Sequence, residues 1–217
     1  LAERLSGDDE QSRTYGHPRI FVWMLWTYFP VSLVAFWAFV WMLAHGHNGG
    51  DLLGLATLVQ SLSGFDMIAA HAGDGWGSYL IGALLFSQIA SIGSVSIGHE
   101  LSHRTWEAYS VFSSRACSLF GLFTYYAIEH PYGHHFTVGT PADSSTAFRG
   151  ESVYRYFLRT APQDYQTAWA IEKDRLDKLG LPTMTWRNRL IQGWLAEAAL
   201  VLFVFAVSGF LGLFWFL

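Results

Sequence analysis

The chain has 217 residues, of which 52% are hydrophobic, 17% aromatic and only 14% charged, with a formal net charge of −4. Soluble domains carry about 25% charged residues, so this composition indicates a membrane protein. The small net charge and the lack of a Lys/Arg run argue against nucleic acid as a partner. The single cysteine, Cys117, excludes an intrachain disulfide and a cysteine-based zinc site.

Three apolar segments predict membrane-spanning helices. The first runs from residue 20 to residue 44 and, at about 25 residues, can cross a hydrocarbon core of about 30 Å. Pro30 is expected to kink it. The second covers residues 78–98 and the third residues 190–217. No alternating pattern suggests a barrel, so the prediction is an all-α integral membrane protein.

The distribution of Lys and Arg predicts the topology. Residues 45–75 contain neither, whereas residues 140–189 contain eight, so the second stretch should be cytoplasmic and the first outside. The second span then returns inward and brings His99 to the cytoplasmic face. Two moderately apolar segments, 52–70 and 108–128, contain polar residues and are predicted to be interfacial or re-entrant rather than spanning.

Five of the nine histidines lie in two clusters that adjoin apolar segments: His99 and His103, then His130, His134 and His135. Residues four apart share one helix face, so each cluster should aim two imidazoles at one point. His135, about 100° around the helix from His134, could bind a second ion or cap the first. Without thiolates or a four-helix di-iron carboxylate pattern, non-haem iron fits best.

The other four histidines are interpreted as structural or solvated: His17, His45, His47 and His71. Two other functions compete with a histidine-rich iron site. The stretch 99–103 matches H-E-x-x-H, in which Glu100 would be the general base of an intramembrane zinc protease, but this leaves the second cluster unexplained. A metal-binding transporter or a homologue without catalysis is the non-enzyme alternative.

The two clusters carry a family resemblance. Residues 99–104 (HELSHR) and 129–135 (EHPYGHH) resemble the first two histidine boxes of the membrane alkane hydroxylases, the alkane 1-monooxygenases, within the membrane fatty acid desaturase/hydroxylase superfamily. The likeness continues at residues 140–143 (TPAD), in the stretch around G-E-S-x-Y at 149–155, and in the amphipathic segment 168–176.

This resemblance implies a six-helix membrane fold with a histidine-ligated di-iron centre on the cytoplasmic side of a bacterial inner membrane. The family uses O2 to hydroxylate a terminal C–H bond of an alkane, with electrons from a rubredoxin reduced by an NAD(P)H-dependent reductase. A xylene-type methyl-aromatic hydroxylase and an acyl-lipid desaturase stay open as alternatives. The implied iron ligands are His99, His103, His130, His134 and His135.

The chain departs from the family pattern in its histidine boxes, and residues 45–75 are also longer than the corresponding connection expected in the family. A third box of the H-x-x-H-H kind, and a further ligand histidine before it, do not occur before Leu217. Residues 1–217 are therefore predicted to be one incomplete domain, shortened at both ends and inactive alone, because five imidazoles cannot fill two iron coordination spheres.

Residues around the ligands receive supporting roles in this interpretation. Glu100, Glu129 and Asp143 are candidates to hold the second ring nitrogen of a ligand histidine. An apolar substrate channel should rise between the spans, with four aromatic residues as candidate walls: Trp23, Trp26, Phe86 and Phe123. The cationic stretch 149–189 is attributed to topology rather than to docking of an acidic electron donor.

Overall fold

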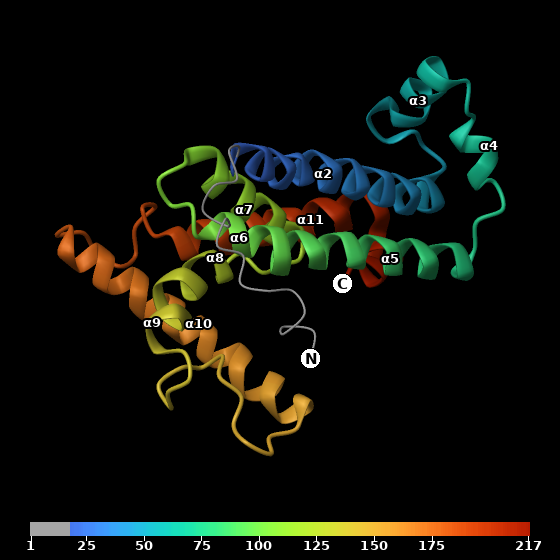
Figure 1. The fold of residues 1–217 in the computed structure, drawn as a ribbon. Helices are drawn as coiled ribbons and strands as arrows, with labels where there is room; N and C mark the ends of the chain where they lie inside the picture. Colours follow the sequence, from blue (N-terminus) through green and yellow to red (C-terminus); the bar gives the residue numbers. More distant parts are fainter. Residues whose placement is uncertain (1–17) are drawn as a thin grey trace, which may run out of the picture.

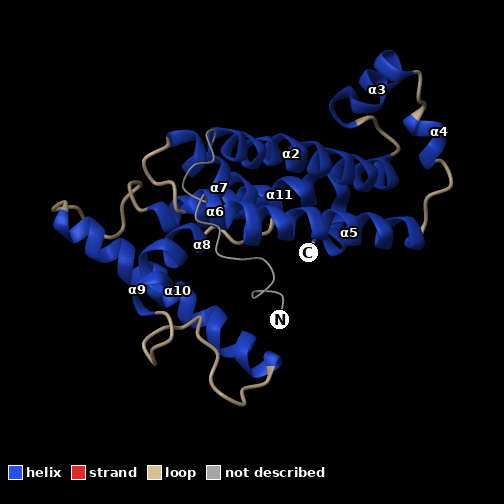
Figure 2. Ribbon diagram, viewed as in Figure 1, coloured by secondary structure: helices blue, strands red, loops and turns tan. Residues whose placement is uncertain are grey.

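The computed structural model describes residues 18–217, which form helices and loops, with no strand in that range (Figures 1 and 2). His17, interpreted above as structural, lies outside the described residues. In chain order the helical elements are α2 (Pro18–Asn48), η1 (Leu52–Gly54), α3 (Leu55–Ser63), α4 (Met67–His71), α5 (Trp76–Ser91), η2 (Ile92–Ile97), α6 (Gly98–Ser102), α7 (Ala108–Phe120), α8 (Tyr126–Glu129), η3 (His130–His134), α9 (His135–Thr137), α10 (Val153–Lys178) and α11 (Arg189–Phe216).

Three long helices lie side by side and form the bundle (Figure 1). Each is long and apolar enough to cross a membrane: Arg19–Asn48, the continuous stretch Trp76–Ser102 and Arg189–Phe216. The predicted all-α membrane fold with three spans is thereby confirmed. Pro30 lies inside α2 without ending it.

Aromatic side chains fill the space between the three spans. Phe36 of α2 stacks on Phe120 with ring centroids 5.1 Å apart, and Phe86 and Phe216 lie 6.1 and 6.2 Å from it. The outward faces instead carry large exposed apolar side chains, such as Val34 on α2. In a bilayer such exposure carries no hydrophobic penalty, because lipid tails are as apolar as the side chains.

The third span is not one straight helix. Gly209 interrupts α11 with φ 64° and ψ −168°, a conformation that strongly favours glycine. The 20 or so residues before it already cover about 30 Å at 1.5 Å per residue. Beyond the break the chain turns, and Phe216 packs 5.9 Å from Phe86 of α5.

The segments predicted not to span are short. Helices α3 and α4 lie at one end of the bundle (Figure 1), where Asp51 accepts hydrogen bonds from Trp41 Nε1 and from the backbone N–H of Ala56. Helix α7 rises only about 20 Å, less than a hydrocarbon core of about 30 Å. The interfacial or re-entrant interpretation of both segments agrees with these lengths.

Helix α7 packs closely on the end of the second span because small residues line the contact. Ser114 Oγ donates to the backbone oxygen of Gly98 at 2.7 Å. A Cβ at Gly98 would lie 2.9 Å from Gly93 O and 3.4 Å from Ser114 O, so only glycine allows this approach. The contact fixes α6, which carries the first histidine cluster.

Candidate metal centre

The first histidine pair lies where the second span ends. His99 is in α6 and His103 follows directly as its C-cap residue, one turn further on. Their ring centroids are 5.0 Å apart. The π-helical turns of η2 precede them, a feature that is frequent near functional sites. The i,i+4 pairing expected from the sequence therefore holds for this cluster.

The second cluster adopts a different geometry from the one expected. The backbone of η3 is π-helical, and the N–H of His135 donates to His130 O, five residues earlier. Residues five apart then face the same side. His135, rather than His134, accompanies His130: their Nε2 atoms are 2.9 Å apart.

Pro131 is the sequence signal that could have revealed this turn. A proline has no N–H, so it removes one α-helical hydrogen bond and its ring crowds the preceding turn. Pro131 stands directly after the ligand candidate His130, inside η3. Pro131 therefore indicates that residues 130–135 do not keep regular α-helical spacing.

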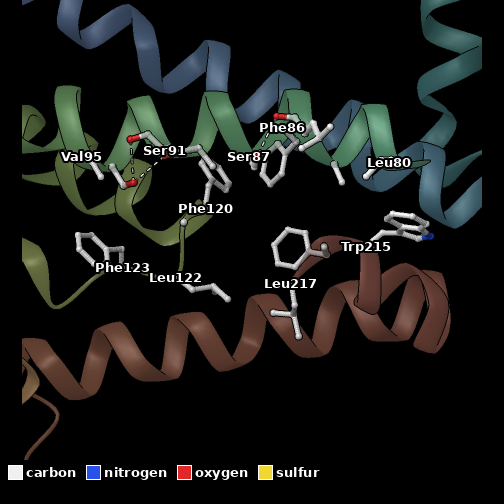
Figure 3. Close-up of a pocket in the computed structure, with 16 residues that line it drawn as sticks. Leu80, Phe86, Ser87, Ser91, Val95, Phe120, Leu122, Phe123, Trp215 and Leu217 are labelled. Atoms are coloured by element: carbon white, nitrogen blue, oxygen red, sulfur yellow. Dashed lines mark hydrogen bonds between the residues drawn. The ribbon is translucent and has the colours of Figure 1, made fainter. Parts of the chain in front are cut away.

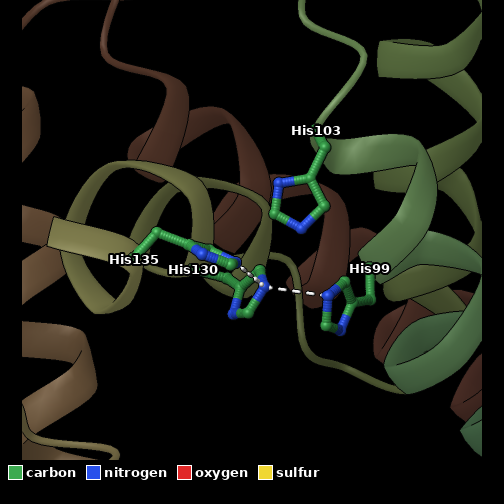
Figure 4. A group of neighbouring side chains, drawn as sticks. All are labelled: His99, His103, His130 and His135. Atoms are coloured by element: carbon green, nitrogen blue, oxygen red, sulfur yellow. Dashed lines mark hydrogen bonds between the residues drawn. The ribbon is translucent and has the colours of Figure 1, made fainter. Parts of the chain in front are cut away.

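Four imidazoles from the two clusters converge (Figure 4). One ring nitrogen from each of His99, His103, His130 and His135 lies within 4.8 Å of the others. His130 is central, since its Nε2 is 3.1 Å from His99 Nε2 and 2.9 Å from His135 Nε2. For metal–nitrogen bonds of about 2.1 Å, two ligands at a right angle lie about 3 Å apart, so the spacing fits a metal ion.

His134 stands beside this group rather than in it. Its Nδ1 lies 2.9 and 3.1 Å from the two carboxylate oxygens of Asp143. Asp143 is 2% exposed and is itself held by Ser145 N–H and the Thr146 hydroxyl. A carboxylate on one ring nitrogen fixes the imidazole and leaves Nε2 for a metal. The expected supporting role of Asp143 therefore has a matching contact.

The two candidate supporting glutamates, Glu100 and Glu129, differ in burial. Glu100 is exposed on α6 and makes no hydrogen bond within residues 18–217, so the structure gives it no contact of the supporting kind. Glu129 is buried, and neither carboxylate oxygen has a hydrogen-bond partner among the described residues. Burial, with Asp164 and Asp143 adding to it, raises the pKa of Glu129 to about 7. Gly133 makes room for this carboxylate, because a Cβ there would lie 3.1 Å from Glu129 Oε1.

The electrostatics favour neutral imidazoles. Burial, then the neighbouring His99 and His135, lower the pKa of His130 to about 3. Burial and the same neighbours also lower the pKa of His103. At neutral pH these rings are uncharged and keep a lone pair for a metal ion, as metal binding requires.

An apolar cavity of about 500 Å³ lies beside the site, between the second span and the turned end of α11 (Figure 3). Two stacked rings separate the cavity from the histidines. Phe123 lines the cavity, and its ring centroid lies 4.9 Å from that of Tyr126. The Tyr126 centroid lies 4.7 Å from that of His130. Of the four candidate walls, Phe86 and Phe123 line this cavity. Trp23 is exposed and Trp26 Nε1 donates to Ser110 Oγ, so neither does.

The remaining histidines lie away from the cluster. His45 stacks on Trp41 with centroids 4.9 Å apart, and His71 Nδ1 pairs with Asp74 at 2.5 Å. His47 packs against the backbone of Gly209. These contacts agree with the structural role predicted for them.

A helical membrane bundle with four convergent imidazoles next to an apolar cavity defines a membrane protein with a histidine-rich candidate metal site. Residues 74–217 match the model of the fatty acid desaturase family, and the chain belongs to that family. The predicted resemblance is thus confirmed.

Several relatives bear the name alkane 1-monooxygenase, among them two from Pseudomonas aeruginosa and one from Acinetobacter baylyi. Alkane 1-monooxygenase 2 of Pseudomonas aeruginosa is 36% identical over 140 residues, covering 59% of this chain and 36% of the relative. Alkane 1-monooxygenase 1 of the same organism is 33% identical over 147 residues, 66% of this chain and 37% of the relative. The enzyme of Acinetobacter baylyi is 34% identical over 116 residues, 54% of this chain and 28% of the relative. The aligned part thus spans about a third of these relatives.

Proposed function

We propose that the full protein is a non-haem iron monooxygenase of the membrane, which uses O2 to hydroxylate a terminal C–H bond of an alkane or a similar apolar chain. The convergence of imidazoles from two separate stretches carries this proposal. The names of the relatives and the adjacent apolar cavity support it. The activity is proposed for the whole protein, because the aligned part of this chain covers only about a third of the relatives.

The donor set fits iron in a di-iron arrangement. The four convergent imidazoles would hold one ion, and His134, oriented by Asp143, would contribute Nε2 to a second. An alkane C–H bond is too strong and too apolar for side-chain acids or bases to break. Bound iron would supply the activation of O2 that this reaction requires. Further ligands would come from the rest of the protein.

The chain's own residues position the substrate and exclude water. The cavity has no charged lining residue, so its walls favour an apolar chain. Leu80, Leu84 and Val95 line it and are exposed, so the cavity is open along the second span. An apolar substrate could therefore enter from the lipid, and the reacting end would meet the histidines past Phe123 and Tyr126.

The electron supply and location follow the same proposal. A rubredoxin-type donor with its NAD(P)H reductase would deliver electrons at the cytoplasmic face of a bacterial inner membrane. The eight cationic residues between 140 and 189 support that orientation. A single-zinc protease fits less well, because the H-E-x-x-H pair shares its site with His130 and His135 while Glu100 is exposed.

Feeding cells that express the full-length protein with alkanes, xylenes and fatty acids is expected to yield terminal alcohols from alkanes. Ser87→Phe, which adds a ring to the cavity wall, should lower turnover of the longest accepted alkane by about tenfold or more and spare the shortest. Products are measured by gas chromatography and mass spectrometry.

Leu85→Phe is the matched control, because Leu85 is exposed on the same helix and does not line the cavity. Methyl-hydroxylated xylenes or unsaturated acyl chains as the main products would replace the alkane proposal with the corresponding alternative. An identical chain-length profile in both variants would show that this cavity does not hold the substrate.

A further inference from the structure

Two further cavities adjoin each other beside α7, separate from the cavity near the histidines. The larger, about 430 Å³, is an apolar groove between one face of α7 and the first two turns of α11. The smaller, about 110 Å³, is lined by more polar residues, among them Ser102, Thr105 and Tyr132. The two cavities share Arg115 and Arg189 in their walls. A polar pocket that continues into an apolar groove, with cations at the junction, matches an amphiphile with a negatively charged head.

The charges around the junction do not balance. Glu172 is fully buried and accepts hydrogen bonds from Arg175 and Arg189. Arg115 is partly buried and has no carboxylate within ion-pairing distance among residues 18–217. Arg175 and Arg189 therefore share one carboxylate, and Arg115 adds a further positive charge at the junction.

The energetics of Arg115 point to a missing anion. Burial, and then the positive charge of Arg189, lower the pKa of Arg115. A guanidinium nevertheless stays protonated, so a negative partner would stabilise a partly buried one. Phosphate oxygens suit this position, because arginine binds them with parallel N–H···O bonds.

The depth of the junction identifies the source of the phosphate. Arg189 is the first residue of a span, so the junction lies at the level of the lipid headgroups. The groove then follows α11 from Arg189 past Gly193 to Ala196, into the region of the acyl chains. Phe112, which lines it, is exposed and gives lipid access from the side.

We propose that these two cavities bind an anionic phospholipid, with its phosphate between Arg115 and Arg189 and one acyl chain in the groove between α7 and α11. The site is separate from the substrate cavity and does not depend on the proposed oxidation. The lipid would bridge α7, which supports the first histidine pair, and the start of α11.

The test uses the full-length protein reconstituted in nanodiscs of mixed phosphatidylcholine and phosphatidylglycerol, then re-extracted in mild detergent. Phosphatidylglycerol retained per protein is measured by mass spectrometry. Arg115→Gln is expected to lower retention by about fivefold, the typical contribution of one cationic residue near a membrane surface. Arg115→Lys should recover part of it. Arg149→Gln is the control, because Arg149 is exposed in the same cationic stretch and lines neither cavity.

A second variant tests the groove without changing a charge. Ala116→Phe places a ring in the groove and should lower retention as much as Arg115→Gln. Ala116→Phe also tests the proposal if the Arg115→Gln variant does not fold. Inorganic phosphate should not displace the lipid. Retention that is unchanged in both variants, equally reduced in Arg149→Gln, or competed by inorganic phosphate would overturn the phospholipid site.

Discussion

Replacing His130 with Ala in the full-length protein is expected to remove most bound iron and to abolish alkane oxidation. His130 is the buried centre of the cluster, with Nε2 near both His99 and His135. Loss of an outer partner of a ligand already costs about 10–100-fold in metal affinity, so loss of the ligand itself should cost more. Iron per chain is measured by atomic absorption, and oxidation by product analysis.

Two further histidine variants make this result specific. His71→Ala is the control, because His71 pairs with Asp74 and packs edge to face with Trp41, away from the cluster, and it should keep the full iron content. His134→Ala should remove about half of the iron if His134 serves a second ion, and should abolish oxidation. Iron and oxidation that survive His130→Ala would show that the four-imidazole group is not the iron site.

The second large effect is expected at Glu172, which ties α10 to the start of the third span. Its carboxylate is fully buried and accepts from Arg175, from Arg189 Nε at 2.6 Å and from the Arg189 N–H at 2.9 Å. Glu172→Gln leaves two guanidinium groups without their anion and should destabilise the protein by about 3–5 kcal/mol. Thermal unfolding in detergent measures the change.

The same carboxylate predicts the pH dependence of stability. Burial acts to raise the pKa of Glu172, but the hydrogen bonds from Arg175 and Arg189 outweigh it and hold the pKa at about 2, below its ordinary 4.5. The stabilisation is therefore complete above pH 4.5 and is lost as the pH falls toward 2. Glu172→Gln should lack this acid-dependent part of the loss.

Asp174→Asn is the matched control on the same helix. Asp174 pairs with Lys178 at 2.6 Å, but both side chains are largely exposed, and such pairs contribute about 0–1 kcal/mol. A loss of stability as large in Asp174→Asn as in Glu172→Gln would mean that the buried network does not hold α10 to the bundle.

The spans could be predicted because their signal is local. An apolar run of about 20–25 residues has few other solutions than a membrane helix. The break at Gly209 could not be read in the same way, since a single glycine in an apolar run is compatible with a straight helix and only the packing against His47 shows why no side chain fits there.

The candidate site was predictable in its residue types but not in its grouping. The spacing of His99 and His103 gave their common face correctly, because α6 is a regular helix. The π-turn exchanged His134 for His135 in the four-imidazole group, and such a turn depends on tertiary packing as well as on Pro131. The sequence predicts a supporting carboxylate at Asp143, which contacts His134, but for Glu100 it leaves open whether the carboxylate supports a ligand or is exposed, and the structure shows it exposed.

The cavities and the buried charges depend on contacts between distant parts of the chain. Phe123 and Phe86 were recognisable as aromatic residues near the site, yet Trp23 and Trp26 satisfied the same criteria and lie elsewhere. The direction in which each side chain points decides whether it lines the cavity. When a helix is apolar on all sides, its sequence does not show which side faces the cavity.

X-ray absorption at the iron edge of the purified full-length protein, together with its metal content, tests whether the two histidine stretches share one centre. About two irons per chain are expected, with imidazole scattering that weakens in both His99→Ala and His135→Ala, one variant from each stretch. One zinc per chain, or an iron environment that responds to only one of the two stretches, would contradict a centre shared between them.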